Sequence, residues 1–251
     1  MHAPPPLRVV VEPFGDSAVM VTIPDGDTRR RRDAIIEFRT RLLSRPPAGV
    51  LDVVSGLESL LIEFDPIDTS PEHLDYAAQL LAELPDARSS AARASSRHFT
   101  IPVVFDEEAG PDLVSVAEET GTGVDDLVAS IASSTFTIAL LGAAMAPMMA
   151  GLTLPRRVRR RAEPRTDVPP GSLMIAGTHA IIQPFPGPSG WRVVGRTSRT
   201  IVDITREAPI SFAIGDRVRF VPVPRSTTPE CTGVFLLPDG ADSGERCRAE
   251  A

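Results

Sequence analysis

Proline and glycine restrict this chain more than any other residue types. It contains 25 prolines and 18 glycines among 251 residues. Proline removes a backbone donor and breaks helices, and glycine opens turns, so long uninterrupted helices are excluded from most of the sequence. From residue 136 to 223, short apolar runs alternate with Gly and Pro turns. This pattern predicts a closed β-barrel or a β-sandwich.

The first 85 residues predict a different arrangement. Apolar runs at 7–11, 19–23, 50–54 and 60–64 are expected to be strands. A helix capped by Asp27 or Thr28 is expected to run to about Leu43, and a second helix begins after Ser70-Pro71. The order of two strands, a helix, two strands and a helix indicates a small α+β sandwich. The fold class is therefore α+β, with a β-rich second domain.

Polar composition sets the domain boundaries. Residues 86–97 are small and polar without an apolar period, and we expect them to link a domain at 1–85 to one at 98–224. In the second domain Pro111 begins a helix, and Thr122 with Asp125 forms a capping box before the next one. Residues 225–251 are polar and irregular, so a disordered tail is expected.

Charge and cysteine content exclude several classes of function. The formal net charge is −7, which disfavours general nucleic-acid binding. The two cysteines, Cys231 and Cys247, form no Cys-x-x-Cys pair, so neither a disulfide framework nor a metal site is expected. The first residues lack a basic region followed by an apolar one, which predicts a cytoplasmic protein.

One uncharged stretch of 19 residues runs from Phe136 to Leu154 and precedes several arginines. Its length can span a bilayer, and its basic flank suits a stop-transfer signal. However, Gly142, Pro147 and Gly151 interrupt it. We therefore interpret it as a buried strand followed by an apolar loop, and expect no membrane segment.

Four ordered motifs resemble a known family. They are "IPVVFDEEAGPDLVSVAEETG", "VPPGSLMIAG", "PSGWRVVGRT" and "IGDRVRFVPV". Their order and spacing are similar to those of the allophanate hydrolase subunit 1 family, over about residues 8 to 223. This family includes the B subunit of bacterial ATP-dependent 5-oxoprolinase and the Kip-type inhibitors of a sporulation histidine kinase.

The resemblance implies a small α+β domain followed by a cyclophilin-like β-barrel, in agreement with the periodicity. It also implies ATP as cofactor and a small cyclic amide as substrate. The implied partner is a protein like allophanate hydrolase subunit 2 or the C subunit of 5-oxoprolinase, and ATP can bind on that partner or between the subunits. No Gly-x-x-x-x-Gly-Lys-Ser/Thr loop occurs in the chain, so no familiar phosphate cradle is available here.

Several motifs of the family are altered. The pattern Leu-Gly-Phe-x-Pro-Gly-Phe-x-Tyr-Leu-x-Gly-Leu is here "LGAAMAPMMAGL", one residue shorter and without its aromatic side chains. The family's Gln-Thr-Gly is replaced by His179-Ala180-Ile181. Ala and Ile cannot hydrogen-bond an amide or a carboxylate as Gln and Thr do. The scaffold is thus retained, while either the substrate differs or the catalytic activity is weakened.

His179 and Arg165 are the candidate catalytic residues. Histidine titrates near neutral pH, so His179 can transfer a proton; the alternative is a strand histidine bonded to a neighbouring backbone. Arg165 matches the family's second Pro-Arg, and a guanidinium binds carboxylate or phosphate through paired hydrogen bonds. The other arginines of 156–161 are interpreted as a solvated loop that balances an acidic surface.

The candidate substrate-binding residues are Arg160, Trp191, Arg196 and Thr197. Arg160 stands near the family's first Pro-Arg, and Trp191 matches a Gly-Gly-Trp motif. The tryptophan can form a pocket wall or anchor the barrel core. Arg196 and Thr197 follow Gly195 in "GRT", where they can orient polar substrate atoms or cap a turn.

Two functions follow from these observations. The chain can be one subunit of an ATP-dependent hydrolase that opens a cyclic amide, in the manner of 5-oxoprolinase. Alternatively, it can be a protein-binding regulator without chemistry of its own. The methionines at 145–149 suit the second function, because methionine adapts to varied contact surfaces.

Overall fold

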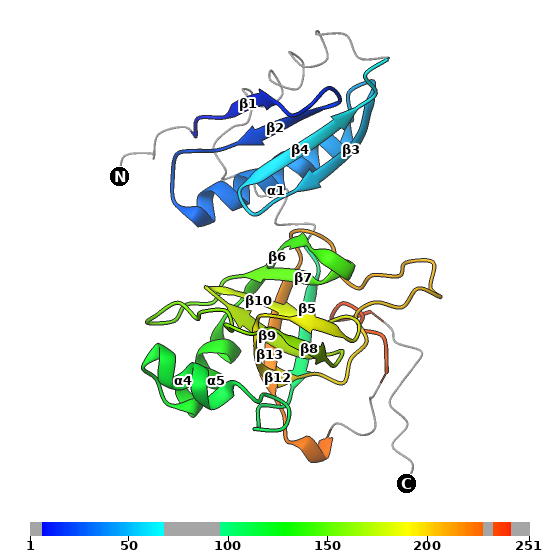
Figure 1. The fold of residues 1–251 in the computed structure, drawn as a ribbon. Coiled ribbons are helices and arrows are strands. Elements are labelled where there is room, and N and C mark those ends of the chain that lie inside the picture. Colours follow the sequence, from blue (N-terminus) through cyan, green and yellow to red (C-terminus); the bar gives the residue numbers. More distant parts are fainter. Residues whose placement is uncertain (1–6, 68–95, 228–232, 242–251) are drawn as a thin grey trace. The chain divides into compact units, whose positions relative to one another are not determined.

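The computed structural model describes residues 7–67, 96–227 and 233–241 (Figure 1). The chain divides into two compact units, Met1–Ser95 and Ser96–Ala251. The second helix predicted for the first unit and most of the predicted linker lie outside the described residues, as do both cysteines.

The first unit is a four-stranded antiparallel sheet with one helix on it. Its elements are β1 (Val10–Pro13), β2 (Ala18–Thr22), α1 (Thr28–Ser44), β3 (Val50–Ser55) and β4 (Ser59–Phe64). The sheet order is β1-β2-β4-β3. Asp27 caps α1, because its side chain accepts the backbone N–H of Arg30 at 2.9 Å. The predicted strands and first helix of this unit are confirmed.

The core of the first unit explains why the helix lies on the sheet. Ile35, Phe38 and Leu42 recur along one face of α1 and are at most 2 % exposed. They pack against Val21 and Leu60, which are fully buried on the sheet. The 3–4 residue spacing on the helix and the alternation along the strands each produce one apolar face. Burial of these two faces against each other stabilises the unit.

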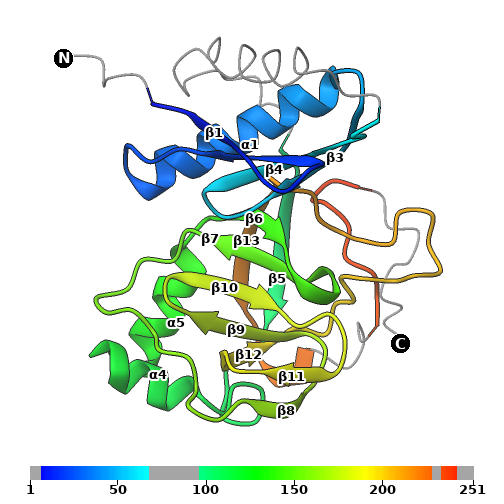
Figure 2. The same ribbon diagram turned by 45° about the horizontal axis from the view of Figure 1, so that its top comes forward.

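The second unit is a nearly closed mixed β-barrel with two helices packed beside it (Figures 1 and 2). The seven strands of the sheet follow the order β12-β9-β10-β7-β6-β13-β5. The elements are β5 (His98–Val103), α4 (Leu113–Thr120), α5 (Val124–Ser133), β6 (Phe136–Leu141), β7 (Pro147–Ala150), β8 (Arg165–Val168), β9 (Ser172–Ala176), β10 (His179–Ile182), β11 (Gly187–Ser189), β12 (Arg192–Arg196) and β13 (Arg217–Pro222).

A single β-bridge joins the two ends of this sheet. Val104, which follows β5, pairs with Arg196, the last residue of β12. The N–H of Val104 donates to the Arg196 carbonyl at 2.9 Å, and the N–H of Arg196 donates to the Val104 carbonyl at 3.0 Å. Closure removes the exposed edges that an open sheet presents. We call the place where β5 and β12 meet the seam.

The uncharged stretch from Phe136 to Leu154 forms a hairpin rather than a strand and a loop. β6 and β7 pair antiparallel, with Thr137 opposite Ala150 and Leu141 opposite Pro147. Phe136, Ile138 and Met149 are fully buried in the barrel core. The glycine and proline positions divide the stretch into two strands. No helix in the described ranges has the length and apolar character needed to cross a membrane.

Two other sequence expectations are corrected. The capping box of Thr122 and Asp125 does not form, because Gly123 is the N-cap of α5 and the Thr122 N–H instead donates to Ala117 at the end of α4. The sequence predicts disorder from residue 225 onward, whereas residues 225–227 form a short 3₁₀ turn. Phe235 and Leu236 are also buried, at 8 % and 5 % exposure.

The turn of the β6–β7 hairpin contains two residues in the left-handed region. Ala144 has φ of 54° and Met145 has φ of 62°. This conformation costs a non-glycine residue about 1–2 kcal/mol. Ala144→Gly is therefore expected to raise the free energy of unfolding by about 0.5–1 kcal/mol, after roughly 0.5–1 kcal/mol is lost to the greater freedom of unfolded glycine.

Denaturant unfolding followed by Trp191 fluorescence measures this effect, because the chain's single tryptophan lies in the barrel unit. Ala143→Gly serves as the matched control, since Ala143 is not among the left-handed residues of the described chain, and a loss of stability is expected there. Equal destabilisation by both substitutions would contradict the strain.

Candidate functional site

A buried carboxylate organises the arginines of the barrel unit. The side chain of Asp112 is 4 % exposed. Arg165 donates to its two oxygens at 2.5 and 3.0 Å, and Arg161 donates at 2.9 Å. The backbone N–H of Val193 in β12 donates at 2.8 Å, while the Asp112 N–H donates back to the Val193 carbonyl at 2.9 Å. Asp112 thus ties α4, β8 and β12 together.

The environment of Asp112 favours its ionised form. Burial raises the pKa of the carboxyl group, but the hydrogen bonds from Arg165 and Val193 and the charges of the two arginines outweigh it, so the pKa is lowered. The ionised carboxylate of Asp112 therefore offsets the positive charges of Arg161 and Arg165.

Glu119 has the same role at a position two helical turns further along α4. Because 3.6 residues make one turn, Asp112 and Glu119 lie on the same face of the helix. Glu119 accepts the backbone N–H and the Nε–H of Arg159, both at 2.9 Å. Arg192 reaches Glu119 at 3.6 Å and Asp112 at 3.9 Å. We call Asp112, Glu119 and the arginines 159, 161, 165 and 192 the arginine network.

Arg165, the predicted catalytic arginine, belongs to the arginine network. Both terminal nitrogens of Arg165 donate to Asp112. Arg160, a predicted substrate-binding residue, is exposed. Its guanidinium lies beside Gly190, since a Cβ added at Gly190 would be 3.4 Å from Nη2 of Arg160. The network therefore connects the start of α4 to β8 and β12.

His179 and Trp191 lie on the outer face of the barrel sheet. His179 begins β10, opposite Ala150 of β7 and Ala176 of β9. Ala180 and Ile182 belong to the barrel core, so the alternation of a strand places His179 and Ile181 on the other face. Trp191 packs against the small buried cluster of Val168, Met174 and Val193.

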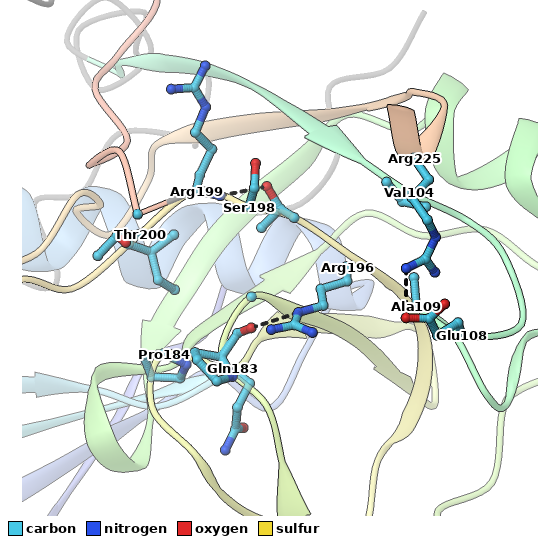
Figure 3. A pocket seen from close by; sticks show the side chains of 15 residues that line it. Val104, Glu108, Ala109, Gln183, Pro184, Arg196, Ser198, Arg199, Thr200 and Arg225 are labelled. Atoms are coloured by element: carbon cyan, nitrogen blue, oxygen red, sulfur yellow. Dashed lines mark hydrogen bonds and ion pairs between the residues drawn. The ribbon is translucent and has the colours of Figure 1, made fainter. Parts of the chain in front are cut away.

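A pocket of about 400 Å³ lies at the seam, at one end of the barrel (Figure 3). It forms where several elements end: Val104 follows β5, Gln183 follows β10, Arg196 ends β12 and Gly171 precedes β9. Residues 197–201 and Arg225 complete much of the wall. We call this cavity the seam pocket.

The seam pocket contains two of the predicted substrate-binding residues. Arg196 and Thr197 line it. Arg160, Arg165, His179 and Trp191 do not belong to its lining, so the structure does not bring the two groups of candidates together at this cavity. The catalytic roles of Arg165 and His179 remain predictions.

The charge of the seam pocket contrasts with that of the whole chain. Its lining holds three arginines, at 196, 199 and 225, and one glutamate, Glu108; with Asp106, which pairs with Arg225 from outside the lining, three positive charges stand against two negative charges. Arg225 donates to Asp106 at 2.6 Å and lies 2.8 Å from Glu108; its hydrogen bond lowers the pKa of Asp106. The pocket is positive in a protein of net charge −7, which favours an anionic ligand.

Sequence reasoning missed the other polar residues of this pocket. Gln183, Arg199 and Arg225 carry no motif, and Arg225 lies 119 positions from Asp106. The only available signal was the "GRT" motif, which placed Arg196 and Thr197 correctly at a cavity. In the described part of the chain, no group of three or more His, Cys, Asp or Glu residues could hold a metal ion.

Comparison with known proteins identifies a family. The model of the carboxyltransferase domain, subdomain C and D, matches residues 9–212, so the chain belongs to that family. The resemblance stated from the motifs is thereby confirmed.

Individual relatives are more specific. The chain is 29 % identical to the B subunit of 5-oxoprolinase from Haemophilus influenzae, over 84 % of this chain and 96 % of the relative. It is 32 % identical to the B subunit of 5-oxoprolinase from Escherichia coli O157:H7, over 83 % and 94 %. Among solved structures, TTHA0988 is 30 % identical with a TM-score of 0.70; the match covers 85 % of this chain but 41 % of that one.

Proposed function

We propose that this chain is the B-type subunit of an ATP-dependent hydrolase that opens a cyclic amide, with 5-oxoproline as the substrate. The observation that carries the proposal is the match to nearly the full length of two proteins named as B subunits of 5-oxoprolinase. A positive pocket that contains the "GRT" residues Arg196 and Thr197 supports it, because 5-oxoproline bears a carboxylate.

The proposal includes a partner polypeptide. The match to TTHA0988 covers less than half of that chain. We propose that the part of TTHA0988 outside the match corresponds to a second polypeptide, of the subunit 2 or C type, that works together with this chain. Unaided attack on a lactam is slow because amide resonance makes its carbonyl a poor electrophile, which explains the need for ATP.

The arginine network does not fit ATP as a ligand. The sequence lacks a Gly-x-x-x-x-Gly-Lys-Ser/Thr loop, and carboxylates of α4 hold the arginines 159, 161 and 165. We propose that ATP binds on the partner or at the junction of the subunits. The proposed share of this chain is to contact the substrate with Arg196 and Thr197. His179 does not line the seam pocket, so its predicted role in proton transfer is not part of this proposal.

A second candidate function is a protein-binding regulator without chemistry. The tip of the β6–β7 hairpin favours it, since Met145 is 47 % exposed there and adopts a strained left-handed conformation. An adaptable apolar side chain on a strained turn is suited to contact with a partner protein.

Reconstitution separates the two functions. When the chain is mixed with its A- and C-type partner subunits, ADP release is expected to depend on added 5-oxoproline. An assembled complex that releases no ADP in response to 5-oxoproline would reject the hydrolase and leave the regulator.

A further inference from the structure

We infer that the seam pocket takes a small ligand by a single carboxylate group, and that the guanidinium of Arg196 holds this group. The inference deepens the proposed function and rests on it for the identity of the ligand, 5-oxoproline. The lining of this pocket includes neither His179 nor any member of the arginine network.

Arg196 is oriented but not neutralised. Its Nε donates to the carbonyl oxygen of Pro170 at 3.3 Å, and Figure 3 shows the guanidinium among the residues that line the pocket. Among the residues that the structure describes, no carboxylate pairs with Arg196. Its terminal nitrogens are therefore available for the paired hydrogen bonds that a carboxylate accepts.

The other two arginines of the pocket differ from Arg196. Arg225 is bound by Asp106 and Glu108, so its charge is already offset. Arg199 has no carboxylate partner within the described ranges, and its Nε is buried without a hydrogen-bond partner there. Its guanidinium points away from that of Arg196 in Figure 3. Arg199 thus adds positive potential, while Arg196 is placed for direct contact.

The backbone around Arg196 is fixed on both sides. Its own N–H and carbonyl form the bridge to Val104 that closes the barrel, and the N–H of Thr197 donates to Gly171 at 2.9 Å. These bonds fix the point from which the Arg196 side chain extends into the pocket. Apolar atoms of Val104, Pro184 and Ile201 also line the cavity and can cover the methylene groups of a small ring.

Calorimetric titration of the full-length chain with 5-oxoproline tests the inference. Arg196→Ala is expected to weaken Kd at least 10-fold, Arg196→Lys is expected to restore some of the affinity, and 2-pyrrolidinone, the same lactam without the carboxylate, is expected to bind at least 10-fold more weakly. Arg157→Ala is the matched control, because it removes an exposed arginine outside the pocket. Arg196 is itself exposed, so its replacement leaves the core intact.

Equal affinity of the Arg196→Ala variant, equal binding of 2-pyrrolidinone, or no binding of 5-oxoproline to the unaltered chain overturns the inference. Such a result alongside 5-oxoproline-dependent ADP release by the complete complex would leave the proposed function standing. If the complex of unaltered subunits shows no ADP release that depends on 5-oxoproline, the proposed function itself is rejected.

Discussion

Replacing Asp112 with asparagine is expected to lower the free energy of unfolding of the barrel unit by about 3 kcal/mol. The substitution keeps the size of the side chain but removes the charge that offsets Arg161 and Arg165. It also presents an amide N–H₂ group to neighbours that are themselves donors. Denaturant unfolding followed by Trp191 fluorescence measures the loss, and Asp167→Asn, at an exposed position of β8, is the control.

The same substitution is also expected to change how the free energy of unfolding depends on pH. The folded pKa of Asp112 is lowered, so its contribution to stability is present above the unfolded value of about 4 and is lost as the pH falls through the folded value. The unfolding free energy of the unaltered protein should therefore decline more steeply on acidification than that of Asp112→Asn. Two parallel pH profiles would contradict the role assigned to this carboxylate.

Replacing Gly171 with alanine is expected to cost about 4 kcal/mol and to distort the seam pocket. Gly171 has φ of 79°, and a Cβ at this position would lie 2.2 Å from the carbonyl oxygen of Thr197. The backbone cannot retreat easily, because the Gly171 N–H donates to Gln183 and its carbonyl accepts from Thr197. Both strain and collision therefore oppose the side chain.

Gly240→Ala separates these two causes. Gly240 has φ of 82° with nothing within 4 Å of an added Cβ, so only the left-handed conformation is penalised, at about 1 kcal/mol. Thermal and denaturant unfolding of both variants provide the comparison. Equal losses at the two positions would show that the Thr197 carbonyl is not a barrier, and the description of the pocket wall would have to change.

Local patterns predicted most of the fold. In the first unit, the apolar spacing of Ile35, Phe38 and Leu42 was sufficient to place α1, because a helix face repeats every three to four residues. In the second unit, the Gly and Pro turns predicted short strands and a barrel. The β6–β7 hairpin was only half predicted, since Ala144 and Met145 occupy a left-handed turn without the glycine that normally signals one.

The candidate site depended on contacts that no local pattern records. Asp112 meets Arg165 across 53 positions and Val193 across 81. In the sequence, Pro111 beside it predicted only the start of a helix. Arg165 was therefore assigned to chemistry by resemblance, although its two terminal nitrogens serve Asp112. Arg196 and Thr197 line a cavity because the barrel closes at Arg196. This closure depends on the order of the strands in the sheet, which the composition of the chain does not reveal.

Steady-state kinetics of the reconstituted complex test the central claim, that this chain contributes the seam pocket to 5-oxoproline-dependent ATP hydrolysis. With unaltered partner subunits, Arg196→Ala in this chain is expected to raise the KM for 5-oxoproline at least 10-fold while kcat changes less than 3-fold, and Arg157→Ala is expected to match the unaltered chain. An unchanged KM in the Arg196→Ala complex would show that the substrate binds elsewhere and would contradict the account.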